Sequence, residues 1–183
     1  MMKQNVMYTR RLMGLCGAGA VVLWLAGCAV TDIGRAPQMA AGDTVAVLPI
    51  VNYTETPQAG LRAEAIAESL LKTAGMAGLK RYPPSLNPET LFEPAEREAV
   101  GKALEWARGE RVRYALTGAV QEWRYKVGVD GEPAVGISLQ LIEVSSGQVV
   151  WAATGSDAGW SRESLSGVAQ KLLRRLLAPL TQK

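Results

Sequence analysis

The chain has 183 residues, with 20 Lys and Arg against 17 Asp and Glu, and it contains no histidine. The lack of histidine removes the usual general base near neutral pH and the commonest metal ligand, which counts against enzymes that depend on either. The formal charge of +3 comes from bases in the first 27 residues, so the composition gives no sign of a nucleic-acid-binding protein.

The first 28 residues have the order of a secretory signal. A basic segment without acids precedes an apolar stretch over residues 12–25, and its bases are Lys3, Arg10 and Arg11. The four residues Leu25-Ala26-Gly27-Cys28 resemble a lipobox. We therefore expect cleavage before Cys28 and acylation of this residue. An uncleaved transmembrane helix over residues 12–30 is the alternative, which the small residues before Cys28 disfavour.

Cleavage would leave a neutral chain without a usable thiol. The bases before Cys28 number three and the acids none, so the mature chain carries 17 of each, and its only cysteine would be acylated. Disulfides are therefore excluded. Residues 29–44 show no apolar period, so we expect residues 1–27 to be a signal peptide, 28–44 a lipidated flexible tether and 45–183 a single domain. By resemblance to other lipoproteins, in which Asp after the cysteine prevents export, Ala29 at this position implies sorting to the outer membrane.

The first half of the domain alternates strand and helix signals. Residues 45–51 form a short apolar run typical of a buried strand. Thr56 and Pro57 are predicted to cap and start a helix, whose apolar stripe continues to Ala74. A short strand is expected over 79–82. A second helix is predicted to open at Glu93-Pro94, with inward positions Ala99, Ala103, Leu104 and Ala107.

The second half changes to a period of two at Tyr114. Three strands are predicted within 114–127, 135–141 and 148–154, with Asp130-Gly131 in the first turn. The final helix, about 164–180, has a continuous leucine-rich stripe. This order predicts an α/β fold in which a mixed β-sheet contains an antiparallel meander and helices pack on the sheet, an α/β sandwich.

Catalytic and cofactor motifs are not found. Residues 49–60 follow the first strand but lack the glycines and lysine of a phosphate-binding loop. Asp130 and Glu132 could act as paired carboxylates, although two acids on a hairpin tip are far more often solvated surface residues. We therefore expect no enzymatic activity, no cofactor and no metal site.

Charge and tryptophan placement are more informative. Residues 127–161 contain no Lys or Arg and four acids, namely Asp130, Glu132, Glu143 and Asp157. These acids are either ordinary solubility residues or a negative surface that a symmetric oligomer would multiply and that would attract a cationic partner. Trp160 lies in a polar, Gly-rich segment, where it either caps the core or contacts a membrane interface or another subunit. The other mature tryptophans, Trp106, Trp123 and Trp151, fit packing positions.

Several segments together resemble the PelC family of outer-membrane lipoproteins, which serve Pel exopolysaccharide export. They are the lipobox, the strand 45–52, Tyr114-Ala115-Leu116-Thr117-Gly118, Gln121-Glu122-Trp123-Arg124-Tyr125-Lys126, Asp130-Gly131-Glu132-Pro133 and Gly159-Trp160-Ser161-Arg162-Glu163-Ser164-Leu165. The likeness is strongest over 114–165. The pattern Ser146-Gly147 followed by Val150-Trp151 is shared more widely with TolB-N-like and CsgG-like periplasmic domains.

The resemblance implies a ring-shaped homo-oligomer, dodecameric in the family, on the periplasmic side of the outer membrane. Its partners would be a PelB-like β-barrel porin and a cationic polysaccharide. By the same resemblance, Trp160 would belong to an aromatic belt that contacts the membrane or the ring, and Asp130 and Glu132 to a negative surface that guides the polysaccharide. The neutral mature chain departs from a simply acidic protein, so the negative surface would depend on charge placement.

Two other functions remain open. A lipoprotein that activates a cell-wall synthase would need a long tether, whereas the roughly 16 residues after Cys28 span at most about 55 Å at about 3.5 Å each, which is short for that task. A secretion pore of the CsgG type would need amphipathic barrel-forming segments of about 9–11 residues, and the one candidate, the 119–144 hairpin, has a polar face that is too mixed.

Overall fold

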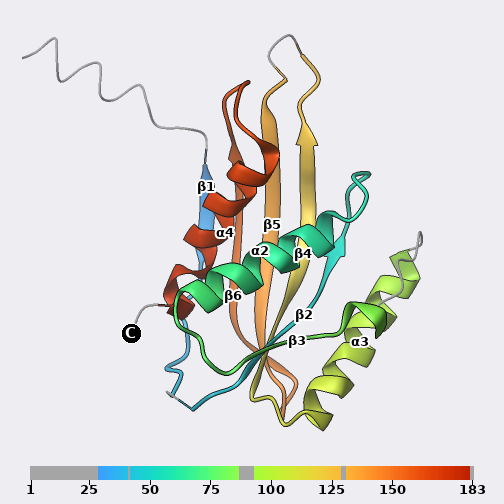
Figure 1. The fold of residues 1–183 in the computed structure, drawn as a ribbon, viewed down its shortest axis with the longest axis vertical. Helices are drawn as coiled ribbons and strands as arrows, with labels where there is room; N and C mark the ends of the chain where they lie inside the picture. Colours follow the sequence, from blue (N-terminus) through green and yellow to red (C-terminus); the bar gives the residue numbers. More distant parts are fainter. Residues whose placement is uncertain (1–28, 41, 87–92, 129–130, 182–183) are drawn as a thin grey trace, which may run out of the picture.

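The structure is a computed structural model that describes residues 29–40, 42–86, 93–128 and 131–181, with the side chains of residues 93–97 left out. Its elements are β1 (Val30–Ile33), β2 (Val45–Asn52), α2 (Ala59–Thr73), β3 (Leu79–Arg81), the short 3-10 helix η2 (Pro84–Leu86), α3 (Glu93–Gly109), β4 (Tyr114–Tyr125), β5 (Pro133–Glu143), β6 (Gln148–Ala158) and α4 (Leu165–Thr181). The strands form one sheet with helices packed on it (Figure 1), which confirms the predicted α/β sandwich.

The sheet is mixed, in the strand order β1-β6-β5-β4-β2-β3. The long strands β4, β5 and β6 form the predicted antiparallel meander. Strand β2 pairs in parallel with β4 on one side and with β3 on the other. Helix α2 connects β2 to β3, and the segment containing α3 leads from β3 to β4. The apolar run of β2 is buried almost throughout, as expected of a strand with parallel neighbours and helices on both faces.

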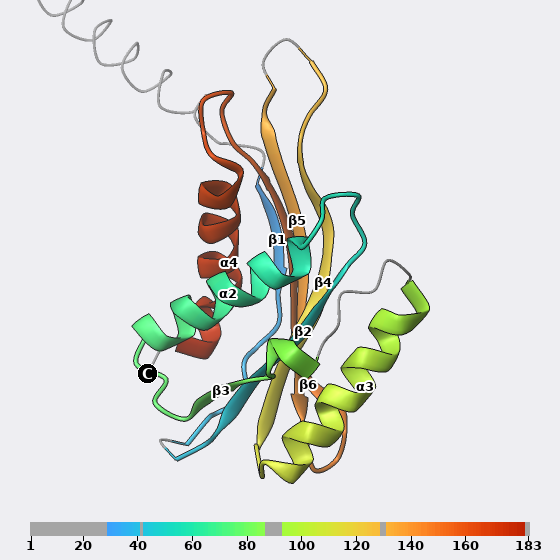
Figure 2. The same ribbon diagram turned by 45° about the vertical axis from the view of Figure 1, so that its right-hand side comes forward.

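Helices α2 and α4 cover one face of the sheet and enclose the larger core (Figure 2). The leucine-rich stripe of α4 is buried as predicted, at Val168, Ala169, Leu172, Leu173, Leu176, Leu177 and Leu180. Trp123 and Trp151 pack into this core with 1% and 3% of their surface exposed. Within the described part of the chain, no helix combines the length and apolar character that crossing a bilayer requires.

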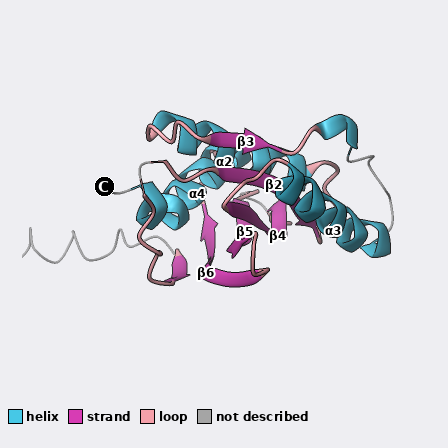
Figure 3. Ribbon diagram, turned by 90° about the horizontal axis from the view of Figure 1, so that it is seen from below, coloured by secondary structure: helices cyan, strands magenta, loops and turns pink. Residues whose placement is uncertain are grey.

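Helix α3 covers only part of the opposite face. Its Ala103 and Ala107 are fully buried against β2 and β4, as the sequence predicts. Seen from below, α3 lies beside β2 and β4 and away from β6 (Figure 3). The rest of this face carries polar residues, among them Asp32, Gln121, Ser138 and Thr154, and the Gln121 amide donates a hydrogen bond to Ser138 Oγ at 2.7 Å. We call the surface that these residues form the open face.

The N-terminal segment differs from the prediction of a flexible tether over residues 28–44. Residues 30–33 form edge strand β1, in which Val30 pairs with Ser156 and Ile33 with Ala153. The Trp151 indole then donates to the Gly34 carbonyl oxygen at 2.9 Å. The tether prediction is therefore wrong for these residues. Periodicity does not reveal β1, because the strand is short and its backbone bonds to β6 hold it in place.

Two element boundaries also differ from the prediction. Strand β6 continues to Ala158, because β1 and β5 both pair with the segment predicted as a loop. Helix α2 begins at Ala59 rather than near Thr56, and Gln58 precedes it in the left-handed region with φ of 62°. The Thr56 hydroxyl donates instead to the Trp123 carbonyl oxygen, so it fastens the β2–α2 loop to β4 and does not cap the helix.

Candidate functional site

One end of the sheet carries the predicted site residues that the structure describes. The connection of β4 to β5, the connection of β6 to α4 and the start of β1 lie together there (at the top in Figure 1). The register explains this placement, because Ser156 pairs with Val30 on one side and with Gly136 on the other. We call this region the hairpin end, comprising Val30, residues 124–128, residues 131–134 and residues 158–165.

Cys28 itself lies outside the described residues, as does Asp130. The strand that follows Cys28 begins at Val30, so Ala29 alone separates the proposed lipid-bearing residue from the sheet. Whatever is attached at position 28 is therefore joined to the hairpin end by a very short connection. The sequence alone did not suggest this closeness, because it gave no sign of β1.

Trp160 lies on the surface of the hairpin end, with 76% of its surface exposed. Within one subunit it is not a core residue, so the core-capping alternative is excluded for the isolated chain. The Glu163 carboxylate accepts a hydrogen bond from the Trp160 backbone N–H at 3.4 Å, and the Glu163 N–H donates to the Trp160 carbonyl oxygen at 2.8 Å. These bonds fix the turn that presents the indole.

Two neighbours hold this turn in place. A side chain at Gly159 would come within 2.5 Å of Val168 and 3.0 Å of Pro133, so only glycine lets the chain pass so close to α4 and β5. Lys171 of α4 forms an ion pair with Glu163. The hydrogen bond from Lys171 lowers the pKa of Glu163 below its ordinary value, which keeps the carboxylate charged. Trp160 is thus exposed on a well-supported turn.

Glu132 lies on the hairpin next to a cation. Its carboxylate is 3.7 Å from Lys126 Nζ, and the Lys126 backbone N–H donates to the Glu132 carbonyl oxygen at 2.7 Å. Both side chains are about half exposed, so water screens the pair and the ionic attraction contributes little to stability. The charge of Glu132 is nevertheless partly compensated by a residue just outside the acid-only interval.

The other acids of the 127–161 interval do not join Glu132 in one surface. Glu143 pairs with Tyr114 at the opposite end of the sheet, where it accepts a hydrogen bond from Ser146 Oγ at 2.8 Å. Asp157 lies near the hairpin end, but it pairs with Arg175 of α4 at 3.2 Å. Among the described acids of this interval, Glu132 alone is thus left to contribute to a negative surface at the hairpin end.

A second acidic region was not foreseen from the sequence. A groove of 1090 Å³ lies along the open face, and three carboxylates line it, those of Asp32, Glu55 and Glu122. Arg124 also lines the groove and pairs with Glu122 at 3.0 Å. Asp32 reaches this place only because β1 pairs with β6, and Glu55 because the β2–α2 loop is fastened to β4. No sequence pattern signals either relationship.

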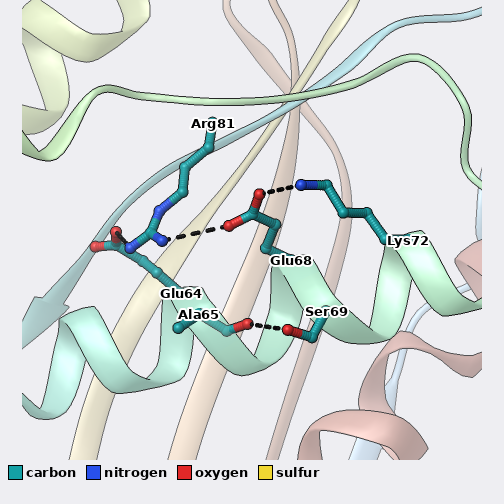
Figure 4. Close-up of polar contacts among 6 residues, drawn as sticks. All are labelled: Glu64, Ala65, Glu68, Ser69, Lys72 and Arg81. Atoms are coloured by element: carbon teal, nitrogen blue, oxygen red, sulfur yellow. Dashed lines mark hydrogen bonds and ion pairs between the residues drawn. The ribbon is translucent and has the colours of Figure 1, made fainter.

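The most buried carboxylate lies elsewhere, on α2 beside the outer strand β3 (Figure 4). Glu64 is 4% exposed, accepts a hydrogen bond from the Ile50 backbone N–H at 3.0 Å and pairs with Arg81 at 3.3 Å. Arg81 also contacts Glu68, which pairs with Lys72 at 2.6 Å. Burial raises the pKa of Glu64, although the Ile50 N–H and Arg81 act against it. These contacts join α2 to the edge of the sheet.

No arrangement suited to metal chemistry is found among the residues that the structure describes. No group of three or more acids or cysteines is placed there to hold a metal ion. The carboxylates at the hairpin end and on the open face can instead act through their charge, by attracting cations over a distance set by salt screening. Together with exposed Trp160, the hairpin end offers an electrostatic and interfacial surface.

Comparison with known structures gives close relatives. The chain is similar to the PelC dodecamer from Paraburkholderia phytofirmans, with 47% identity, coverage of 85% of this chain and 99% of that chain, and a TM-score of 0.72. A single-residue variant of that dodecamer gives 47% identity, 82% and 98% coverage and a TM-score of 0.69.

A more distant structure shares the fold alone. Lipoprotein GNA1162 from Neisseria meningitidis is 14% identical, covers 77% of this chain and 99% of its own, and superposes with a TM-score of 0.51. No protein-family model matches the chain, and no curated protein does.

Proposed function

The chain belongs to the PelC family, and from this premise we propose that it aids export of a cationic exopolysaccharide, Pel, through a partner β-barrel of the PelB type. The protein acts as a ring of identical subunits, anchored to the periplasmic face of the outer membrane through acyl chains on Cys28. Its role is guidance rather than catalysis. The observation that carries this proposal is 47% identity over 99% of a PelC chain that forms a dodecamer.

Electrostatic guidance is the proposed mechanism. A closed ring repeats each surface charge once per subunit, so a few carboxylates at one end create a strong local field even in a neutral protein. Asp130 and Glu132 are the acids proposed to supply these charges, of which Glu132 lies at the hairpin end and Asp130 lies outside the described residues. Lys126 lies 3.7 Å from Glu132 and partly compensates its charge, so the proposed guidance also needs the charge of Asp130.

Membrane attachment positions this field. Acyl chains bind a bilayer with about 0.8 kcal/mol per buried methylene, and tryptophan favours the membrane–water interface. Trp160 is 76% exposed at the same end of the molecule as the strand that follows Cys28, so both attachments act on one face. Trp160 thereby contacts either lipid or the neighbouring subunit of the ring.

A double substitution that removes the charges of both proposed acids tests the guidance mechanism. Asp130→Asn combined with Glu132→Gln should reduce secreted polysaccharide, while the native mass of the solubilised acylated ring stays unchanged. The matched control is Glu110→Gln with Glu143→Gln, which removes two acids from the opposite end of the sheet. Equal secretion by both double variants would reject guidance by the hairpin acids. A monomeric native mass for the unaltered protein would reject the ring itself.

The alternative function, activation of a cell-wall synthase, fits this chain less well. An activator anchored in the outer membrane must reach far across the periplasm, which requires a long connection after the lipid. Here β1 begins at Val30, so the connection is much shorter than the 16 residues expected from the sequence. The native mass of the solubilised acylated protein also distinguishes the two functions, because a monomer would favour the activator.

A further inference from the structure

The centre of the open face carries no charged side chains. Strands β5 and β6 alternate buried residues with residues that point to this face, and the latter form three cross-strand pairs: Gly136 with Ser156, Ser138 with Thr154, and Gln140 with Ala152. Most of them are exposed, yet none is Asp, Glu, Lys or Arg. The centres of protein–protein interfaces are likewise poor in charged residues, because charges are costly to remove from water. The centre of the open face therefore has the composition of a surface that a second protein covers.

Two carboxylates lie at the margins of the groove on this face. Asp32 lies on edge strand β1 and Glu55 on the β2–α2 loop next to β4, with β6 and β5 between them. Both residues are exposed, and neither takes part in an ion pair within the described residues. The third carboxylate of the groove, that of Glu122, is compensated by Arg124 at 3.0 Å. Asp32 and Glu55 thus leave two negative charges at the groove for a cationic partner to neutralise.

The groove is better suited to a protein than to a small ligand or a sugar. Pockets for small ligands are lined mainly by apolar and aromatic side chains and measure about 300–1,000 Å³, whereas this groove measures 1090 Å³. Among the described residues that line it, the one aromatic is Trp123, which is 1% exposed, so no aromatic face is available for a sugar ring to stack on. A wide uncharged surface with charges at its margins instead matches a protein interface with a polar rim.

The outer surface of α2 and α4 carries the opposite charge. These helices cover the other face of the sheet (Figure 2). Three of their exposed bases have partners within the subunit, namely Lys72 with Glu68, Lys171 with Glu163 and Arg175 with Asp157. Arg62 of α2 and Arg174 of α4 are also exposed, but no ion pair involves them in the part of the chain that the structure describes. These two cations match Asp32 and Glu55 in number and are opposite in sign.

The positions of the two surfaces agree with a closed ring. A ring of identical subunits is built from head-to-tail contacts, in which one surface of each subunit meets a different surface of the next. In a ring of many subunits these two surfaces lie on nearly opposite sides of the subunit, as the open face and the outer surface of α2 and α4 do. Contact between two open faces would give a pair rather than a ring, and it would bring the acids of both subunits together.

We propose that the open face of each subunit receives the outer surface of α2 and α4 of the next subunit in the ring, where Arg62 and Arg174 of the partner subunit neutralise Asp32 and Glu55. This inference rests on the proposed ring and names the two surfaces that build it. The uncharged centre of the open face is buried in this contact, and the ion pairs lie at its margins. Cyclic repetition of the contact keeps every hairpin end on the same side of the ring, which attachment of all subunits to one membrane requires.

Charge reversal on each surface tests this contact. The acid-reversed variant combines Asp32→Arg with Glu55→Arg, and the base-reversed variant combines Arg62→Glu with Arg174→Glu. Each variant alone, acylated and solubilised, should have the native mass of a monomer, because its two contact surfaces then carry charges of the same sign. An equimolar mixture should recover the mass of the ring, with the two variants alternating around a ring of even subunit number.

The matched control is Glu110→Arg with Glu143→Arg, which changes the net charge as much as the acid-reversed variant does. These two acids lie at the opposite end of the sheet, so the control should form the ring by itself. Recovery of the ring in the mixture also shows that both reversed variants are folded, because unfolded chains cannot present complementary surfaces.

Full ring mass for either reversed variant alone, or a mixture that stays monomeric, would overturn the proposed contact. If the acid-reversed variant forms the ring by itself but no longer binds a soluble chitosan oligosaccharide, the groove belongs to the polysaccharide and not to a neighbouring subunit. These results leave the ring of the unaltered protein in place. A monomeric native mass for the unaltered protein would instead refute the ring, and with it the function proposed above.

Discussion

The Glu64 carboxylate accepts a hydrogen bond from the backbone N–H of Ile50 at 3.0 Å, although Glu64 belongs to α2 and Ile50 to β2. The β2–β4 register shifts between Val47 and Ile50, and Pro49 lies in the interruption. Strand β3 ends beside Val47, so no strand partner serves the Ile50 N–H. A side chain thus replaces a missing backbone partner and fastens α2 to the sheet.

Removing this carboxylate should destabilise the fold. Glu64→Ala leaves the buried Ile50 N–H without a partner, which costs about 1–3 kcal/mol. Glu64→Gln keeps an acceptor oxygen for that N–H and should lose less. Chemical denaturation of the two variants checks the difference. Equal destabilisation by Ala and Gln would show that the Arg81 ion pair, rather than the Ile50 hydrogen bond, is the important contact.

Glu64 and Glu68 should give opposite pH dependences of stability. Burial raises the pKa of Glu64 above its ordinary value of 4.5, so the folded state holds this proton more tightly than the unfolded state does. The stabilisation from the protonated group is complete below about pH 4.5 and is lost as the pH rises through the raised pKa. The hydrogen bond from Lys72 lowers the pKa of Glu68, so its contribution is present above the unfolded pKa and lost as the pH falls.

Denaturation between about pH 3 and pH 8 measures this. Relative to Glu64→Gln, the unaltered protein should lose stability as the pH rises above about 4.5. Relative to Glu68→Gln, it should gain stability as the pH rises from about 3 to about 4.5, and the difference should stay constant at higher pH. If the free energies of unfolding of the unaltered protein and of Glu64→Gln changed with pH in the same way, the pKa of Glu64 would not be raised in the folded protein.

The edge strand β1 depends on a glycine in β6. A Cβ at Gly155 would lie 2.8 Å from Thr31 Cγ2 and 2.9 Å from the Val30 carbonyl oxygen. Gly155→Ala should therefore separate β1 from β6 or strain their pairing, at a cost of about 1–3 kcal/mol. Hydrogen exchange of the β1 amides reports this directly. Gly136→Ala is the control, because its nearest neighbour would be Glu122 Cβ at 3.4 Å, an ordinary contact.

Sequence patterns predicted the parts of this fold that are repetitive and buried. The stripe of α4 and the alternation across β4 and β5 repeat the geometry of one helix face or one sheet face, so periodicity reveals them. Strand β1 was not predicted, because it is four residues long and mostly exposed. Its stability comes from backbone bonds to β6 and from the small size of Gly155, which are tertiary relationships without a local signal.

The candidate site was predictable to a similar extent. A tryptophan among glycines and polar residues left core capping and a surface contact as alternatives, and only the structure, in which Trp160 is 76% exposed, decides against core capping within the isolated chain. The run of residues without bases suggested one negative surface, but acids close in sequence are separated when a long strand lies between them. Glu143 is at the far end of β5 from Glu132 for this reason. Ion pairs between residues far apart in the sequence, such as Asp157 with Arg175, also cannot be predicted from the sequence pattern.

Replacement of Trp160 should separate function from stability. Trp160→Ala removes an exposed side chain, so the free energy of unfolding should change by no more than about 0.5 kcal/mol. Trp151→Ala removes a buried indole that also donates to Gly34, so it should cost about 3–5 kcal/mol. Association with membranes or native ring mass should fall for Trp160→Ala. A large loss of stability with normal assembly would return Trp160 to a purely structural role.

Removal of a cation should strengthen the proposed negative surface. Lys126→Gln takes away the charge that compensates Glu132 at 3.7 Å, so the assembled protein should bind a cationic polysaccharide more tightly, whereas Glu132→Gln should weaken binding. A soluble chitosan oligosaccharide is a suitable probe, and both changes should shrink as salt shortens the screening length from about 10 Å at 0.1 M.

The matched control for Lys126 is a second half-exposed pair, Lys80 with Glu110, which are 2.7 Å apart at the other end of the molecule. Lys80→Gln changes the net charge by the same amount as Lys126→Gln, so a response to total charge alone would be equal for both variants. Guidance from the hairpin end requires that only Lys126→Gln increases binding of the oligosaccharide. Equal increases would assign the attraction to the protein's overall charge and remove the special role of the hairpin acids.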